Sequence, residues 1–325
     1  MKNIDKIFML GGSGPYSYET IKLGLSKGYK LKVVDLIKDE KVKDLEKSDK
    51  LEYIIADFFR LSDKQIVSML EDCDSFIYAG GVDQLTVPRK PAGRFFYERN
   101  VLTSQRMSRL ARIAGIKNFL ILGAYEAYLA ENNKDLRKAG YHKESYVETR
   151  LLQEELAFYE AEPNMNVSVL RAADIISKEF YEKSKLAVFM GQVRKVNRLL
   201  APKGKIALVS AKALAEASLL ALELNRHRQT YALATGSISY QRLYEIICQE
   251  LFLDREIEVK SFEELEEFYR NDEIETSKKG MEHGIGQINM LRAASIDFEI
   301  KNDLGLAKEE FEEDIRQIVK KLKSL

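Results

Sequence analysis

A glycine-rich turn close to the N-terminus constrains the fold of this chain more than any other feature. The apolar run at residues 7–10 leads directly into Gly11-Gly12-Ser13-Gly14, and Pro15 follows where a helix would begin. Glycine lets a backbone turn tightly and approach a phosphate, and the free N–H groups at a helix start attract negative charge. Proline suits the first helical position, because its ring presets φ and its missing N–H is not needed there. The segment therefore predicts a strand, a phosphate-binding turn and a helix.

A second predicted strand ends in an acidic residue at a suitable distance from these glycines. Residues 30–34 have the composition of a strand and follow a helical segment that ends near Gly28. Asp35 comes next, 24 residues after Gly11. An acid about 20 residues beyond such glycines is where a dinucleotide's ribose hydroxyl is bound. The plain alternative for Asp35 is a solvated acid at a strand end.

The charge balance argues against several classes of protein. Of the 325 residues, 51 are lysine or arginine and 51 are aspartate or glutamate, so no overall basic field favours nucleic acid. Cys73 and Cys248 give no disulfide framework and suit a reducing cytoplasm. We see no leader peptide and no membrane-spanning run, and three scattered histidines do not predict a metal site. We expect a cytoplasmic protein without membrane, nucleic-acid or metal partners.

Short apolar runs alternate with segments of helical length along most of the chain. The expected strands lie at residues 7–10, 31–34, 53–55, 76–79, 119–122, 167–170, 206–209 and 231–234. Such alternation predicts an α/β fold with a doubly wound parallel sheet covered on both faces. We expect a dinucleotide-binding domain at residues 1–172, with 205–235 returning to it. Residues 173–325 would form a smaller substrate-binding lobe.

Several helices can be placed from their apolar spacing. In the helix predicted at residues 95–114, the polar residues Asn100 and Thr103 fall on an otherwise apolar face, so both should bond to neighbouring backbone. Gly115 would end that helix. Further helical patterns lie at residues 179–200, 211–224, 262–269 and 309–322. The glycines at 280, 284 and 286 imitate a nucleotide loop but lack a preceding strand, so we reject that motif.

Taken together, these motifs resemble the extended short-chain dehydrogenase/reductases of the NAD-dependent epimerase/dehydratase family. The resemblance covers residues 6–172 well and the remainder loosely. That family's turn, Thr-Gly-x-x-Gly-x-x-Gly, corresponds to residues 10–17, with Leu10 in place of the threonine and Ser17 in place of the last glycine. The other matching motifs are Ala56-Asp57-Phe58, Tyr78-Ala79-Gly80-Gly81, Asn100-Val101, Tyr146-Val147-Glu148-Thr149-Arg150 with Glu154, and Leu170-Arg171.

The resemblance implies a Rossmann-type fold and a set of site residues. It implies NAD as the cofactor, with NADP as the alternative. It also implies that Tyr146 is the catalytic acid/base and Arg150 its electrostatic partner. The residues implied to contact the cofactor are Gly11, Gly12, Ser13, Gly14, Pro15, Tyr16, Asp35, Asp57, Phe58, Tyr78, Ala79, Gly80, Gly81, Asn100, Gly123, Tyr146 and Arg150.

Two positions depart from the family pattern. The family places two serines after the fifth strand, the second of them catalytic, where this chain has Gly123-Ala124. The family's catalytic lysine is Arg150 here. A cation about 4 Å away could favour tyrosinate by up to ~4 kcal/mol at an effective dielectric near 20. Guanidinium is larger and planar, however, so the exchange is not conservative where geometry is tight.

Two classes of function follow from these residues. The first is an NAD(P)-dependent oxidoreductase or epimerase/dehydratase that acts on a small hydroxy or carbonyl compound, including one that resembles a sugar nucleotide. Tyr125, Glu126 or Tyr128 would then supply a substitute for the missing serine, unless they only pack. The alternative is a non-catalytic NAD(P)-binding sensor or regulatory protein. The helices at 95–114 and 147–159 are a plausible homodimer face.

Overall fold

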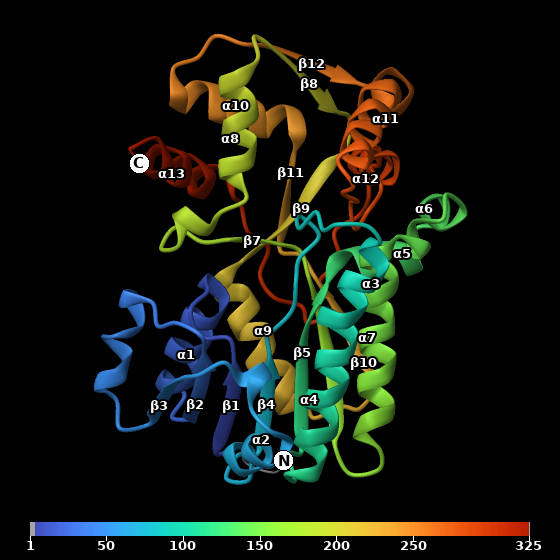
Figure 1. The fold of residues 1–325 in the computed structure, drawn as a ribbon. Coiled ribbons are helices and arrows are strands. Elements are labelled where there is room, and N and C mark those ends of the chain that lie inside the picture. The colour runs from blue at the N-terminus through green and yellow to red at the C-terminus, as the bar shows by residue number, and fades with distance from the viewer. Residues whose placement is uncertain (1–3, 325) are drawn as a thin grey trace.

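The computed structural model describes residues 4–324 and is built on a seven-stranded parallel sheet (Figure 1). The strands lie side by side in the order β10-β6-β5-β4-β1-β2-β3. All of them are parallel, which confirms the predicted doubly wound α/β class. They are β1 (Lys6–Leu10), β2 (Lys30–Asp35), β3 (Leu51–Ile55), β4 (Ser75–Tyr78), β5 (Asn118–Ala124), β6 (Asn166–Ala172) and β10 (Gln229–Leu233).

Alternate residues of each central strand enter two different cores, because successive side chains point to opposite faces. In β1, Ile7 and Met9 pack beneath α1 (Pro15–Ser26) and α9 (Ala211–Leu224). Phe8 and Leu10 pack on the other face, which is covered by α2 (Asp63–Leu70), α4 (Leu102–Ile113) and α7 (Ser145–Ala161). Helices on both faces leave the central strands almost fully buried, which explains their continuous apolar runs.

A second lobe lies above the carboxyl ends of these strands (Figure 1). It holds a three-stranded sheet in the order β11-β9-β7 and the parallel pair β8-β12. Its strands are β7 (Asp174–Ile176), β8 (Arg198–Pro202), β9 (Lys205–Ser210), β11 (Gly236–Ser239) and β12 (Glu256–Lys260). Its helices are α8 (Leu186–Lys195), α10 (Tyr240–Leu251), α11 (Phe262–Lys278), α12 (Gln287–Ser295) and α13 (Glu312–Lys323).

Short elements connect the two parts of the molecule. These include α3 (Ala92–Phe96), α5 (Tyr125–Asn132) and α6 (Lys134–Lys138). Brief 3₁₀ turns occur at η1 (Glu40–Val42), η2 (Leu45–Lys47), η3 (Phe58–Arg60), η5 (Tyr141–Lys143) and η6 (Tyr181–Lys183). A π-helical turn, η4 (Tyr97–Val101), lies between α3 and α4. The division of the chain into domains near residue 172 stays a prediction.

All eight predicted strands are present, but the helix predicted at residues 179–200 is wrong. That stretch contains η6, then α8, which ends at Lys195, and then the beginning of β8. In β8 the side chains alternate, with Leu199 and Ala201 buried, and the strand pairs in parallel with β12. Pairing with a segment more than fifty residues away therefore overrides the local helical pattern.

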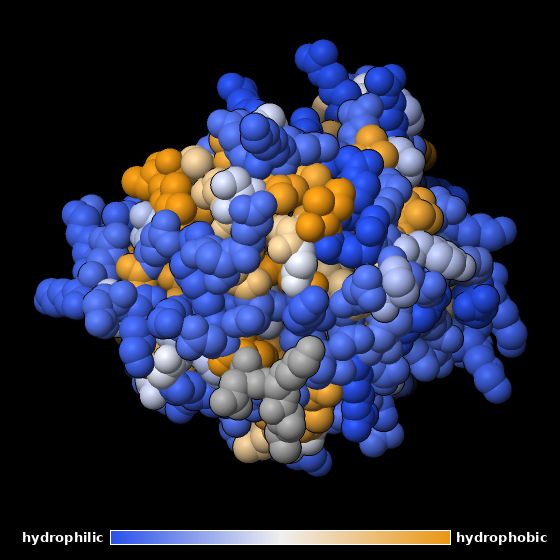
Figure 2. All heavy atoms as spheres, turned by 90° about the horizontal axis from the view of Figure 1, so that it is seen from below, coloured by the Kyte–Doolittle hydropathy of each residue, from blue (hydrophilic) through white to orange (hydrophobic). Residues whose placement is uncertain are grey.

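The lower end of the large sheet, where the parallel strands begin, has a mostly polar surface. Figure 2 looks onto this end and shows hydrophilic residues around small, separate apolar groups. Within residues 4–324, no helix has both the length and the apolar character needed to cross a membrane.

Asn100 is fully buried and clamps the backbone that follows β4. Its side-chain oxygen accepts from the Val82 amide at 2.8 Å, and its amide nitrogen donates to the Val82 carbonyl at 3.1 Å. Thr103 donates to the Arg99 carbonyl at 2.5 Å. These contacts confirm that both polar residues bond to nearby backbone. Gly115 follows α4 with a φ of +88°, as expected of a residue that ends a helix.

We expect Asn100→Leu to lower the free energy of unfolding by about 1–3 kcal/mol, because both Val82 backbone groups would lose their partner inside the core. Urea unfolding followed by circular dichroism measures the change. The exposed residue Val188 on α8 is the control, and Val188→Ala should change stability by less than about 0.5 kcal/mol. Equal effects of the two substitutions would contradict the role assigned to Asn100.

Candidate active site

A cavity of about 350 Å³ lies where the large sheet meets the second lobe. The strand ends contribute Gly123, Ala124 and Ala172 to its wall, and the second lobe contributes Ile206 and Tyr240. Ligands of open α/β sheets bind outside the carboxyl ends of the strands. This cavity is therefore the candidate active site.

The glycine turn after β1 is held in shape by Asp35. One carboxylate oxygen of Asp35 accepts from the Gly12 amide at 2.7 Å and from the Ser13 amide and hydroxyl, both at 2.8 Å. Gly11 has a φ of +92°, a conformation that favours glycine. A Cβ at Gly12 would lie 2.6 Å from a Val33 methyl group, so the turn packs directly onto β2. Asp35 thus joins the ends of β1 and β2.

The start of α1 borders this turn and has free amide groups. Gly14 precedes the helix, Pro15 is its first residue, and the first helical bond runs from the Tyr18 amide to the Gly14 carbonyl. The amides of Tyr16 and Ser17 come before that bond, so they can face an anion. The side chain of Tyr16 is buried, with its hydroxyl 2.7 Å from that of Ser218.

The segment after β3 contains the predicted Asp57-Phe58 pair. The Asp57 carboxylate lies 3.0 Å from the Arg60 guanidinium. The Phe58 side chain is buried in the core, with its ring centroid 5.3 Å from that of Phe8. Any contact of Phe58 with a cofactor would therefore come from its backbone.

The end of β4 brings together Gly81, Asn100 and Arg150. Gly81 has a φ of +141°, and a Cβ there would lie 3.1 Å from the Asn100 oxygen and 3.2 Å from an Arg150 nitrogen. Ala79 adjoins Gly11, since its Cβ would lie 3.6 Å from one built at that glycine. Tyr78 is buried, with its hydroxyl 3.1 Å from that of Thr103. The residues predicted along β4 therefore converge on the glycine turn and Arg150.

Tyr146 lies in the first turn of α7, and its ring is buried beside the cavity. The ring packs edge-on against Phe96, with 5.5 Å between centroids. Its backbone N–H donates to the Gly284 carbonyl at 2.7 Å. Burial raises the pKa of the Tyr146 phenol to about 12, and the nearby Arg150 charge acts in the opposite direction. At neutral pH Tyr146 is therefore protonated and able to donate a proton.

Arg150 lies one helical turn after Tyr146, as their spacing predicts. Its guanidinium carbon is 5.7 Å from the Tyr146 ring centroid. One guanidinium nitrogen donates to the Leu122 carbonyl on β5 and another to Gln153, both at 2.9 Å. Its Nε atom is buried without a hydrogen-bond partner. Arg150 thus fastens α7 to β5 and keeps a positive charge beside the tyrosine.

Glu154 and Arg171, which also belong to the recognised motifs, form a buried ion pair. Arg171 donates to both carboxylate oxygens of Glu154, at 2.6–3.2 Å, and to Glu131 at 2.5 Å. Two parallel hydrogen bonds fix the relative position of the groups as well as pairing their charges. This pair fixes the middle of α7 to β6, so it supports Tyr146 without contacting the cavity.

Further charged residues of the cavity are Glu126, which the sequence offered as a substitute for the family serine, and Asp174 and Lys185, which were not singled out. Glu126 lines its wall just after β5, while Asp174 and Lys185 line it from the second lobe. Lys185 donates to Asp174 at 2.5 Å. Burial raises the pKa of Glu126. Glu126 lies two residues after the end of β5, and Asp174 lies two residues after the end of β6. This position at the carboxyl edge of the sheet is the sequence signal that indicates a role for both carboxyl groups at the site.

The ends of β5 and β6 approach closely where the family has a serine. A Cβ at Gly123 would lie 2.6 Å from a Val169 methyl group, so a side chain would not fit there without movement. Ala124 lies at the cavity wall and is 4% exposed. The site therefore has an alanine methyl where a serine hydroxyl would otherwise face the substrate.

Comparison with known proteins places this arrangement in a family. A model of the NAD-dependent epimerase/dehydratase family matches residues 7–234, more than half of the chain. The chain belongs to that family. It is thus an enzyme of the NAD-dependent short-chain dehydrogenase/reductase type. A search of curated protein sequences gives no significant match.

Solved structures of the same fold share little sequence with this family member. The UDP-glucuronic acid 4-epimerase from Bacillus cereus, solved with NAD, superposes with a TM-score of 0.69 at 11% identity, covering 98% of this chain and 99% of that one. The UDP-N-acetylglucosamine 4-epimerase from Methanobrevibacter ruminantium M1 gives 0.63 at 17% identity, covering 100% and 99%. The protein gox2253 gives 0.73 at 13% identity, covering 98% of both.

The glycine turn has room for the family's cofactor. A Cβ built at Gly14 would meet no atom within 4 Å, so open space lies in front of the α1 N-terminus. The buried Arg150 Nε atom without a partner lies at the other end of the strand edge. An open turn at one end and an unsatisfied donor at the other fit a ligand that lies along the edge.

Gly284 shows how the second lobe fixes α7, the helix that carries Tyr146. A Cβ at Gly284 would lie 2.5 Å from the Phe96 ring and 3.0 Å from the Tyr146 Cβ. The glycine rejected above as part of a nucleotide loop is therefore needed for close packing against α7. Glu144 accepts from the Gly286 amide at 2.8 Å and strengthens the same contact.

We expect Gly284→Ala to displace Tyr146 and to lower kcat, with a loss of stability of about 1–3 kcal/mol from overpacking. Steady-state kinetics and thermal unfolding measure the two effects. Gly191→Ala is the control: a Cβ there meets no atom within 4 Å inside α8, so alanine should be neutral or mildly stabilising. Wild-type kinetics and stability of Gly284→Ala would show that the contact does not fix α7.

Proposed function

We propose that this protein catalyses NAD-dependent epimerisation or dehydration of a hydroxyl-bearing small molecule, with Tyr146 as the acid/base. The observation that carries the proposal is the position of Tyr146: buried at the cavity wall, beside the Arg150 charge and at the carboxyl edge of the sheet. The two UDP-sugar 4-epimerases described above share this fold, so a sugar nucleotide or a compound of similar chemistry is the proposed substrate class.

The cofactor would lie along the edge from the glycine turn to Arg150. The amides at the start of α1 would face its diphosphate, and Asp35 would face the adenosine ribose. Gly81, Asn100 and Arg150 would border its nicotinamide end. The chemistry that NAD would supply there is reversible hydride transfer with a substrate carbon. The remaining steps are proton transfers by residues of this chain.

Tyr146 and Glu126 are the proposed proton carriers. Because Tyr146 is protonated at neutral pH, it is set to donate to a substrate oxygen, and Arg150 favours the phenolate that results. Glu126 lines the same cavity, and its raised pKa brings it closer to neutral pH, where a carboxyl group can both take up and release a proton. It would replace the proton-transfer capacity lost with the family serine.

The sensor alternative predicts a filled substrate space. Instead, the cavity beside Tyr146 is open, and the ionisable groups in its wall include Glu126, Lys185 and Asp174. Raised pKa values of buried groups in a cleft are typical of catalytic sites. This arrangement favours turnover over cofactor sensing.

The exposed faces of α4 and α7 support the proposal of a homodimer. These two helices pack against each other, and the apolar side chains Leu102, Ile113, Leu152 and Tyr159 remain exposed on them. A second copy that covers these side chains would bury them, as stable homodimer interfaces do.

We expect Tyr146→Phe to abolish turnover while leaving the Kd for NAD nearly unchanged, because only the transferable proton is removed. Arg150→Ala should reduce both turnover and NAD affinity, since Arg150 lies beside Tyr146 and would border the nicotinamide end of NAD. Steady-state assays with UDP-sugars and calorimetric NAD titrations measure the two quantities. Undiminished turnover by Tyr146→Phe would eliminate the proposed acid/base.

Glu126→Gln distinguishes a second proton carrier from a wall residue. It should lower kcat/KM by about 10²–10⁴, the usual contribution of general acid–base catalysis, without changing NAD affinity. In the wild type, the acid limb of kcat/KM against pH should lie above the ordinary glutamate pKa of about 4.3. A Glu126→Gln variant that keeps this limb and full activity would assign catalysis to Tyr146 alone.

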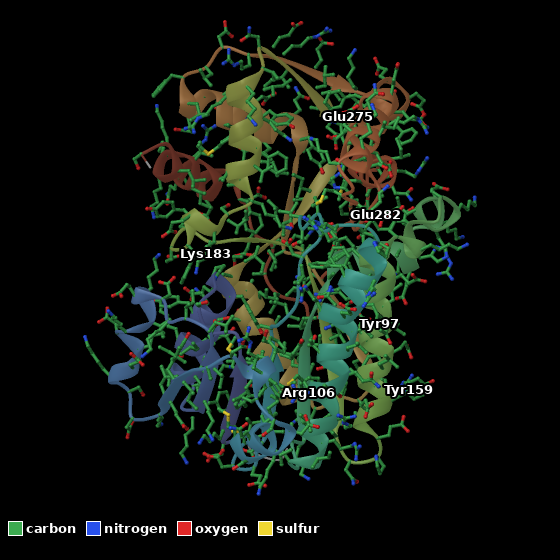
Figure 3. The ribbon with its side chains drawn as sticks, in the orientation of Figure 1. Tyr97, Arg106, Tyr159, Lys183, Glu275 and Glu282 are labelled. Atoms are coloured by element: carbon green, nitrogen blue, oxygen red, sulfur yellow. The ribbon has the colours of Figure 1, made fainter. Side chains whose placement is uncertain are left out.

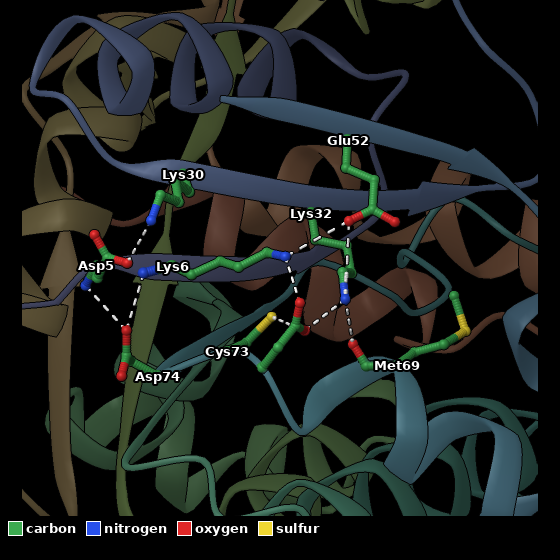
Figure 4. A network of polar contacts seen from close by, with 9 residues as sticks. Asp5, Lys6, Lys30, Lys32, Glu52, Met69, Cys73 and Asp74 are labelled. Atoms are coloured by element: carbon green, nitrogen blue, oxygen red, sulfur yellow. Dashed lines mark hydrogen bonds and ion pairs between the residues drawn. The ribbon is translucent and has the colours of Figure 1, made fainter. Parts of the chain in front are cut away.

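The lysines near Asp35 are already paired, which favours NAD over NADP. Lys32 bonds to Asp72 at 2.5 Å and to the Met69 carbonyl at 3.1 Å (Figure 4). Lys38 bonds to Glu46 at 2.6 Å. Neither is free to receive a 2′-phosphate, while the Asp35 carboxylate would repel one.

We therefore expect the wild-type protein to bind NAD more tightly than NADP. Asp35→Ala should weaken NAD binding and reduce the preference for NAD over NADP. Calorimetric titration with both cofactors measures this. Asp57→Ala is the control, because the proposal places Asp35 and not Asp57 at the ribose that carries the 2′-phosphate of NADP. This variant should leave the ratio of NAD affinity to NADP affinity unchanged. Equal or tighter binding of NADP by the wild type would refute the preference.

A further inference from the structure

A short segment of the second lobe reaches back to the glycine turn. The Lys183 ammonium donates to the Ser13 carbonyl and, at 3.1 Å, to the Asp39 carboxylate. Figure 3 shows Lys183 between the second lobe and the first helix of the large domain. Lys183 and Pro15 also line the same cavity. The Lys183 ammonium, which lies outside the dinucleotide-binding motifs, is thus positioned beside the glycine turn that would bind the cofactor diphosphate.

The backbone around Lys183 is anchored by contacts that do not involve its ammonium group. Phe180 is buried, with its ring centroid 5.6 Å from that of Tyr18 on α1. Glu182 accepts from Lys41 at 2.9 Å, and the Lys41 ammonium also lies 4.6 Å from the Phe180 ring centroid. The segment therefore keeps its place when the Lys183 ammonium changes partner.

The glycine turn offers an anion fewer donors than its length suggests. Pro15 has no N–H, and the amides of Gly12 and Ser13 are both used by Asp35. A diphosphate carries two negative charges, which here would meet only the amide of Gly14 and the amides that follow Pro15. The turn therefore needs a cation from elsewhere, and the ammonium of Lys183 already lies against it.

We propose that Lys183 is a ligand of the cofactor diphosphate, supplied by the second lobe. When NAD binds, the ammonium leaves the Ser13 carbonyl and the Asp39 carboxylate for a diphosphate oxygen. Asp39 keeps its bond from the Lys41 amide at 3.1 Å. The inference rests on the proposed cofactor site and adds to it a contact that joins the two lobes through the bound cofactor.

Comparing ligands with and without phosphate isolates this contact. Calorimetric competition on the full-length protein gives Kd values for NAD, ADP and adenosine. Lys183→Met should raise Kd for ADP and NAD roughly tenfold, the effect of losing one partly exposed charge-assisted hydrogen bond, and leave that for adenosine within about twofold. Lys183→Arg, which keeps the charge, should retain most of the ADP affinity.

Lys41→Met is the matched control, because it removes the contact with Glu182 on the same segment but no charge from the turn. It should leave the ratio of ADP to adenosine affinity unchanged. Equal weakening of ADP and adenosine by Lys183→Met would mean that Lys183 only holds the segment, and unchanged ADP binding would likewise overturn the inference. A wild-type protein that binds neither ADP nor NAD would overturn the proposed cofactor site as well.

Discussion

The parallel arrangement of the large sheet is the constraint on which the rest of the molecule depends. Strands that run the same way end at the same edge, so groups far apart in the chain meet there. The glycine turn, Asp35, Gly81 and Ala124 follow four different strands and border one continuous edge. The central strands hold this alignment because their two faces pack into different cores, and a slip by one residue would move every side chain to the other face.

Close backbone approaches then bring α7, with Tyr146 in its first turn, to that edge. Gly284 of the second lobe touches Phe96 and the first turn of α7, and Tyr146 donates its amide to the same glycine. On its other side α7 is held by the hydrogen bond from Arg150 to the Leu122 carbonyl on β5 and by the buried Arg171–Glu154 pair. The position of one phenol therefore depends on both parts of the chain.

The sequence predicted the large sheet well because its signals are local. Buried parallel strands appear as apolar runs, and glycine, proline and an acid mark the turn between β1 and α1. The parallel pair of β8 and β12 was missed, since its strands carry charges and bury only alternate residues such as Leu199. The hydrogen bonds of Asn100 to nearby backbone were predicted because this polar residue falls on an otherwise apolar helix face. In contrast, the grouping of Glu126 with Lys185 arises only when the second lobe folds over the edge, and no spacing in the sequence encodes it.

The exchange of lysine for arginine has a physical consequence for the chemistry at Tyr146. At 5.7 Å and an effective dielectric near 20, one charge would favour the phenolate by about 3 kcal/mol. The pKa of Tyr146 is nevertheless raised to about 12, so burial outweighs the guanidinium. Two of the guanidinium nitrogens are also turned toward Leu122 and Gln153. A tyrosine with a pKa of about 12 carries its proton at neutral pH but is a weak acid, and it cannot accept a second proton, whereas epimerisation or dehydration requires proton transfer in both directions. The proposed reaction therefore requires a second group of lower pKa in the cavity, and we propose Glu126, the carboxyl group that follows β5 in the cavity wall.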